Sequence, residues 1–161
     1  MFIPYIRKGF LHWQDGKVKI NDCTFGDLQL FLPLPKVYHE IEDEEGNLRF
    51  MFVCDIEIGE VTVLVDPAQD KVMSVVIELF DDMALEDFLR QQGYLAQKHY
   101  QFIDDGENSF IVFNKHFYAR LSEDLDKVCC FIYSNRDFLT ICETSLSRQI
   151  LSLSDQLGQF N

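Results

Sequence analysis

The chain has 161 residues, about the size of one ordinary domain, and 47% of them are hydrophobic. Its 27 acidic residues outnumber its 14 basic residues, which gives a formal net charge of −13. Such a balance argues against nucleic acid or an anionic membrane as the partner, because both require a basic protein face. We therefore expect a single domain over residues 1–161 that binds neither.

The N-terminus does not have the order of a secretory signal, because its apolar residues precede the basic ones and are interrupted by Pro4. No segment approaches the roughly 18 apolar residues that a membrane helix needs. The cysteines are odd in number and contain no CxxC motif: Cys23, Cys54, Cys129, Cys130 and Cys142. This pattern favours reduced, buried thiols and predicts a cytoplasmic protein.

The first third of the chain predicts a hairpin followed by a short helix. Asp15-Gly16 lies between two apolar runs, which is a strong turn signal, and it indicates a hairpin over residues 10–20. Residues 21–34 remain unassigned, because prolines interrupt their alternation of leucines. Pro35 suits the first position of a helix, and we expect that helix over residues 36–41. A charged turn follows over residues 42–47.

Three strands are expected next. Apolar and polar residues alternate over residues 48–58, which is the clearest strand signal in the chain. A tight return leads into a strand over residues 61–65, and a turn over residues 66–70 follows. Residues 72–79 are apolar at successive positions, which is typical of a strand buried on both faces.

The second half predicts a mixture of helix and strand. Asp81-Asp82 stands where helix N-caps stand, and the spacing of apolar residues predicts a helix over residues 83–92. The remaining expected elements are a short strand near 100–103, a turn at 104–108, one long strand at 110–121, a turn at 122–126 and a strand at 128–133.

A final helix is expected from Arg136 to about Leu157, capped by Asn135. Its apolar stripe has helical spacing and consists of Leu139, Cys142, Leu146, Ile150, Leu153 and Leu157. This stripe either packs within the monomer or forms the seam of a homodimer. Together, these elements predict an α+β fold, with two or three helices packed on a mainly antiparallel sheet.

The charge imbalance lies in the middle of the chain, since residues 41–107 hold 17 acidic and four basic residues. The acidic side chains expected to contact a basic partner are Glu42, Asp43, Glu44, Glu45, Asp55, Glu57, Glu60 and Asp70. Complementary charge of this kind speeds encounter and fixes orientation. The alternative is a solvated acidic surface that only maintains solubility.

The chain carries no motif for catalysis or metal binding. Its four histidines are scattered, and no HExxH, P-loop, GxGxxG or GxSxG sequence occurs. The segment 104–107 looks like part of a calcium loop but lacks the ligand at position 12, so we expect a turn. We therefore expect no cofactor, no metal and no enzymatic activity. A cysteine–histidine pair assembled only in space stays open.

The chain resembles bacterial immunity proteins that neutralise polymorphic or contact-dependent toxins. The likeness consists of small size, strong acidity, missing catalytic residues and the segment Leu32-Pro33-Leu34-Pro35-Lys36-Val37 before the strands from Leu48 to Leu79. This resemblance implies that the protein occludes the active site of a basic toxin.

A second likeness, to secretion chaperones of the type III class, rests on the expected order of elements over residues 35–157. That order is a helix, three strands, a helix, two strands and a helix. It implies a dimer that holds an extended segment of another protein.

Overall fold

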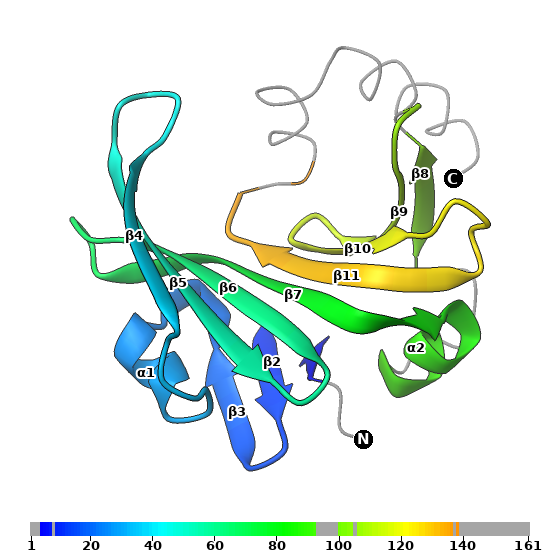
Figure 1. Cartoon of the computed structure of the whole chain (residues 1–161), viewed down its shortest axis with the longest axis horizontal. Coiled ribbons are helices and arrows are strands. Elements are labelled where there is room, and N and C mark those ends of the chain that lie inside the picture. The colour runs from blue at the N-terminus through cyan, green and yellow to red at the C-terminus, as the bar shows by residue number, and fades with distance from the viewer. Residues whose placement is uncertain (1–3, 8, 93–99, 105, 137, 139–161) are drawn as a thin grey trace. The chain divides into compact units, whose positions relative to one another are not determined.

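The computed structural model describes residues 4–7, 9–92, 100–104, 106–136 and 138 (Figure 1). The chain divides into two compact units, Met1–Asp81 and Asp82–Asn161. A single domain over residues 1–161 stays a prediction. The expected helix over residues 136–157, with its apolar stripe and Cys142, lies almost entirely outside the described residues.

Strands dominate the described residues, of which 57% lie in strands and 13% in helices. The mainly antiparallel sheet is confirmed. The finer part of the expected fold class is not shown, because the described part of the chain is mainly β with little helix; an α+β arrangement with two or three helices stays a prediction. No helix in this part of the chain is both long and apolar enough to cross a membrane.

The first unit begins with a small antiparallel sheet in the order β1-β2-β3. The hairpin predicted over residues 10–20 is confirmed, since Trp13 pairs with Gly16 across its turn. The structure adds one strand, which the sequence pattern had not indicated, before this hairpin. The three strands are β1 (Tyr5–Arg7), β2 (Phe10–Trp13) and β3 (Gly16–Lys19).

A short helix, α1 (Phe25–Gln29), lies within the segment that the sequence left unassigned, after the 3-10 turn η1 (Ile20–Asp22). Thr24 and Asp27 start it with a reciprocal capping box. The Asp27 amide donates to Thr24 Oγ1 at 3.1 Å, and the Thr24 amide donates to Asp27 Oδ2 at 2.9 Å. The Phe25 ring stacks on Phe52 with 3.9 Å between ring centroids, so α1 covers part of the following sheet.

Four antiparallel strands complete the first unit in the order β4-β5-β6-β7 (Figure 1). The three strands expected after residue 47 are confirmed. The first two differ by one or two residues at their ends, and the third continues to Ala84 instead of ending at residue 79. β7 extends three residues past the boundary of the unit. The bounds are β4 (Val37–Glu42), β5 (Leu48–Ile56), β6 (Gly59–Asp66) and β7 (Lys71–Ala84).

The expected helix over residues 36–41 is wrong, because this segment is the strand β4. The Lys36 amide donates to the Val53 carbonyl oxygen at 2.8 Å, which starts the pairing with β5 at the position where the helix was expected to begin. Val37, Tyr38 and Ile41 are β-branched or aromatic, and such residues favour strands.

The core of the first unit follows the alternation of β6. Val61 and Val63 are fully buried, and the register places them opposite Ile77 and Val75 of β7. On the other side, Val61 lies opposite the buried Cys54 of β5. This face therefore holds a continuous apolar layer across three strands, which stabilises the sheet by removing it from water.

Gly59 allows β6 and β7 to approach closely. A Cβ atom added at this residue would lie 2.1 Å from the Glu78 carbonyl oxygen, a distance that forces the backbone to move. We expect Gly59→Ala to lower the free energy of unfolding by about 1–3 kcal/mol. Gly26 in α1 is the matched control, because a Cβ there meets nothing nearer than 3.5 Å. Urea unfolding should show Gly26→Ala equal to or more stable than the wild type; equal loss in both variants would contradict the steric argument.

The second unit contains the helix α2 and an antiparallel sheet in the order β11-β10-β9-β8. The predicted helix over residues 83–92 is confirmed with a later start. The expected cap at Asp81-Asp82 is wrong, because both residues continue β7, and the Leu85 amide donates to the Asp126 carbonyl oxygen instead. The bounds are α2 (Leu85–Gln92), β8 (Gln101–Asp104), β9 (Ser109–Asn114), β10 (Phe117–Leu121) and β11 (Lys127–Ser134).

The single strand expected over residues 110–121 is wrong, because the chain reverses between β9 and β10. Asn114 Oδ1 accepts hydrogen bonds from the amides of His116 and Phe117, both at 2.9 Å. Asparagine favours such turns, since its short side chain bonds to the backbone two residues further on. The expected turn over 122–126, the strand near 128–133 and the short strand near 100–103 are all present.

Aromatic side chains fill both faces of this second sheet. Phe88 of α2 is fully buried, and its ring centroid lies 5.5 Å from that of Phe131. A separate buried cluster consists of Ile103, Phe110, Tyr118 and Phe138. The Phe138 ring lies 4.5 Å from that of Tyr118, so the residue just beyond β11 closes this cluster.

The four described cysteines carry free thiols, and Cys23, Cys54 and Cys130 are buried, as the sequence led us to expect. Burial raises the pKa of the Cys23 thiol to about 11 from an ordinary 9.0, and the nearby Asp27 carboxylate adds to this shift. Folding therefore favours the protonated thiol. Its contribution to stability is fully present below pH 9.0 and is lost as the pH rises through about 11.

We expect the free energy of unfolding to fall between pH 9 and pH 11, and to fall less steeply in Cys23→Ala. Urea unfolding at several pH values measures both proteins. Below pH 9.0 their difference in stability should stay constant, since the thiol is protonated in both the folded and the unfolded state. If the free energies of unfolding of the two proteins fell in parallel between pH 9 and pH 11, Cys23 would not contribute to the loss of stability.

Candidate functional site

The structure divides the eight predicted partner-binding acids between the two ends of β5. One set lies around the β4–β5 turn and the neighbouring β6–β7 turn: Glu42, Asp43, Glu44, Glu45 and Asp70. The other set lies around the β5–β6 turn: Asp55, Glu57 and Glu60. Because a nine-residue strand spans roughly 25 Å, the two sets form separate charged ends of one sheet.

Asp43 has a structural role in the β4–β5 turn. Its Oδ1 accepts hydrogen bonds from the amides of Asn47 and Glu45, both at 2.9 Å. The other carboxylate oxygen lies 3.2 Å from Arg49, whose guanidinium also lies 3.2 Å from Asp66. The hydrogen bond from the Asn47 amide is the largest of several causes that hold the pKa of Asp43 below its ordinary value. Asp43 therefore stabilises the turn rather than offering a free charge.

Glu42, Glu44 and Glu45 remain exposed at this end of the sheet. Pairing between β5 and β6 begins only at Phe50, whereas pairing between β4 and β5 continues to Glu42 and Leu48. The acidic turn therefore extends beyond the adjacent strand. Among the described residues, no cation forms an ion pair with these three glutamates, so their charge is available to a partner.

Asp70 differs from these glutamates in its backbone. It adopts a left-handed conformation, with φ of 51°, in the turn before β7. Aspartate is one of the few residues that tolerate this conformation, which gives Asp70 a reason to be present apart from its charge. Its side chain is exposed, so both roles are compatible.

At the opposite end, three carboxylates lie in a row across the sheet. Asp55 pairs in register with Glu60, and Glu60 pairs with Glu78. Like charges directly opposite one another destabilise a sheet. Lys36 offsets this repulsion, since its Nζ lies 3.0 Å from Asp55 and 2.7 Å from Glu60. The hydrogen bond to Glu60, followed by that to Asp55, raises the pKa of Lys36.

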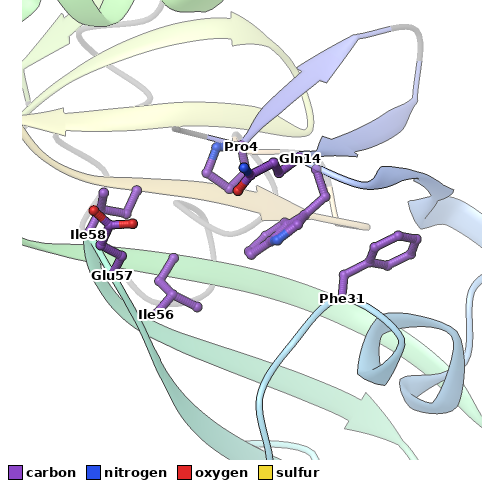
Figure 2. A pocket seen from close by; sticks show the side chains of 7 residues that line it. Pro4, Gln14, Phe31, Ile56, Glu57 and Ile58 are labelled. Carbon is purple, nitrogen blue, oxygen red and sulfur yellow. The ribbon is translucent and has the colours of Figure 1, made fainter. Parts of the chain in front are cut away.

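A pocket of about 150 Å³ lies beside this row within the first unit. Its lining residues are Pro4, Trp13, Gln14, Phe31, Ile56, Glu57 and Ile58. Figure 2 shows Phe31 on the opposite side of the pocket from Ile56 and Glu57. The Glu57 carboxylate is exposed, and no ion pair joins it to a described residue. The aromatic wall of this pocket, formed by Trp13 and Phe31, and the Glu57 carboxylate at its rim are a suitable environment for a cationic side chain.

Sequence reasoning identified Glu57 but missed Trp13, Phe31 and Glu78. The two aromatic residues are far from Glu57 in the sequence, and only the packing of the first unit brings them to one pocket. Glu78 belongs to a strand that reads as apolar, and its place in the acidic row depends on the β6–β7 register. The one available signal was the lone tryptophan beside a predicted turn.

No group of three or more His, Cys, Asp and Glu side chains that could hold a metal ion occurs among the described residues. His116 Nδ1 lies 2.9 Å from the Ser134 carbonyl oxygen, and the His12 ring stacks on Tyr5 with centroids 4.5 Å apart. Both rings are therefore engaged in local packing. A scan against protein-family models and searches of curated proteins and of solved structures find no match to this chain.

Proposed function

We propose that the protein is an acidic binding module that neutralises a basic toxin by occluding its active site, as immunity proteins do. The observation that carries this proposal is a group of predicted partner-binding acids at the ends of the first unit's four-stranded sheet. They are exposed and form no ion pair with any described residue, and they include Glu42, Glu44, Glu45 and Glu57. Unpaired like charges repel one another and cost stability. A basic partner offsets this cost by supplying the missing cations.

The pocket at the Glu57 end gives this interaction a point of attachment. A lysine or arginine side chain of the toxin would place its cation between the aromatic wall and the Glu57 carboxylate. The acidic β4–β5 turn would speed encounter and orient the partner. Because exposed charges are screened by salt, the affinity should fall as ionic strength rises.

Affinity purification from the protein's own cells, at low and then at high salt, tests this proposal. We expect one folded, stoichiometric partner that is released by salt and identified by mass spectrometry. The purified partner should be toxic when expressed alone, and an equimolar amount of this protein should abolish its activity. A partner that keeps its full activity in the complex would overturn the neutralising function.

The alternative of a secretion chaperone receives less support from the order of elements. A strand stands where the opening helix was expected, and four strands rather than two follow α2. A chaperone-like protein would hold an extended segment of a secreted protein without inhibiting a folded toxin. The toxicity and inhibition measurements described above separate the two functions, because only a neutralising protein abolishes the activity of a toxic partner.

We also infer that the protein acts in the cytoplasm, where thiols stay reduced. The free thiols of the four described cysteines support this inference. A homodimer through the apolar stripe around Leu146 stays a prediction. Sedimentation equilibrium of the wild type and of Leu146→Ala would test it.

A further inference from the structure

β4 is the outer strand of the first unit's four-stranded sheet (Figure 1). Among the described residues, it pairs only with β5, from Val37–Val53 to Glu42–Leu48, and no bulge interrupts this register. Five of its six residues are exposed. A regular, exposed edge strand is a template for pairing with a further strand.

The backbone of β4 presents unpaired groups along this edge. The Asp43 amide donates to the Asn47 carbonyl oxygen at 3.0 Å, which marks this pair as hydrogen-bonded. In an antiparallel ladder, the hydrogen-bonded pairs alternate along each strand. The N–H and C=O groups of Tyr38, Glu40 and Glu42 therefore point away from β5, toward the open edge.

The side chains of the same three residues decide which strand can pair there. Glu40 and Glu42 are acidic, and Tyr38 is 47% exposed with its hydroxyl 2.9 Å from Glu40. A second copy paired antiparallel about Glu40 would place the two Glu40 carboxylates opposite each other. A second copy paired in parallel and in register would place like carboxylates opposite each other at both Glu40 and Glu42. Like charges directly opposite one another are destabilising, so this edge opposes pairing with itself.

We propose that β4 accepts an extended segment of a basic partner protein as an added strand of its sheet. Lysine or arginine side chains at alternating positions of that segment lie opposite Glu40 and Glu42, while main-chain hydrogen bonds supply the register. This assignment rests on the proposed function, because it takes the partner to be basic. It places the contact on the β4 edge, which lies between the two acidic ends of the sheet, and identifies the contact as strand pairing with the partner.

Amide hydrogen exchange of the full chain, measured by NMR, tests the proposal directly. The probe is a short, capped peptide that alternates lysine with valine, and the control peptide alternates glutamate with valine. We expect the lysine peptide to slow exchange at Tyr38, Glu40 and Glu42 by on the order of tenfold at low salt, and the glutamate peptide to have no effect. Protection elsewhere but not at these amides would overturn the proposal.

A variant pair separates the backbone from the charge. Glu40→Pro removes an outward amide, which an edge strand tolerates, whereas Glu40→Gln keeps the amide and removes only the charge. We expect the peptide to bind Glu40→Pro on the order of tenfold more weakly than Glu40→Gln. Equal affinities would overturn strand pairing. If circular dichroism shows that Glu40→Pro is unfolded, the exchange pattern of the wild type decides.

Two further outcomes distinguish this proposal from the proposed function. Protection of the β4 amides that grows with protein concentration, in the absence of peptide, would identify a second copy as the occupant and overturn the assignment. Toxin neutralisation that is unchanged in Glu40→Pro, together with no peptide protection, would overturn edge pairing and leave the neutralising function standing. Peptide protection without any toxin partner would support edge pairing alone.

Discussion

Replacing Glu44 and Glu45 together with lysine is expected to weaken partner binding by at least roughly tenfold at low salt, while the protein stays folded. Both side chains are exposed at the tip of the β4–β5 turn and form no ion pair with a described residue. Their contribution to stability is therefore small. Isothermal titration with the purified partner measures the affinity, and urea unfolding checks the fold.

The neighbouring Asp43 is left unchanged in this variant. Its carboxylate accepts two backbone amides and pairs with Arg49, so a lysine there would disturb the turn itself. In this turn, only the three glutamates Glu42, Glu44 and Glu45 can therefore be exchanged without disturbing the fold.

Glu123→Lys with Asp124→Lys is the matched control. These two acids are also consecutive and exposed, and they lie in the turn between β10 and β11 of the second unit. The change in net charge is the same in both double variants. If the control variant weakens binding equally, only the total charge of the protein matters. If neither variant weakens binding, the acidic turn is a solvated surface, and the hypothesis that it contacts a basic partner is wrong.

Truncating Phe88 is expected to produce the largest loss of stability among the core substitutions considered. Phe88→Ala should lower the free energy of unfolding by about 3–5 kcal/mol, because the side chain is fully buried and removal leaves a cavity. Its ring packs against Phe131 at 5.5 Å and Phe113 at 6.0 Å between centroids. Urea unfolding followed by circular dichroism measures the change.

Phe80→Ala is the matched control, since the same atoms are removed from a side chain that is 61% exposed. We expect a change within about 0.5 kcal/mol of the wild type. A loss comparable to that of Phe88→Ala would show that Phe80 is covered by another part of the chain or by a second copy. A small loss at Phe88 would contradict its assignment to the core.

Strands with regular alternation were predictable because their signal is local. Residues 48–58 and 61–65 alternate in the sequence. The register places Phe50, Phe52 and Cys54 opposite the buried valines of β6, Val61, Val63 and Val65. The hairpin at Asp15-Gly16 was likewise predictable, because its turn depends on two adjacent residues.

The errors arose where pairing between distant segments overrides a local preference. Pro35 favours the start of a helix. The Lys36 amide nevertheless donates to the Val53 carbonyl oxygen, and the chain continues as the strand β4. Between Phe110 and Leu121 most residues favour strands, and the sequence therefore predicted a single strand. Asn114 was a local signal for the turn that divides this segment into β9 and β10. The capping box of Thr24 and Asp27 was a second local signal that could have been found.

The sequence by itself determined the acidity of this protein, its strand-rich middle and the identity of the candidate acids. Only the tertiary structure decided what each acid does. Backbone amides and Arg49 hold Asp43 in its turn. Lys36 pairs with both Asp55 and Glu60. Glu57 lies beside an aromatic pocket. The physical reason is that charge is a property of a residue, whereas its pairing and exposure depend on neighbours that strand register brings from elsewhere in the chain.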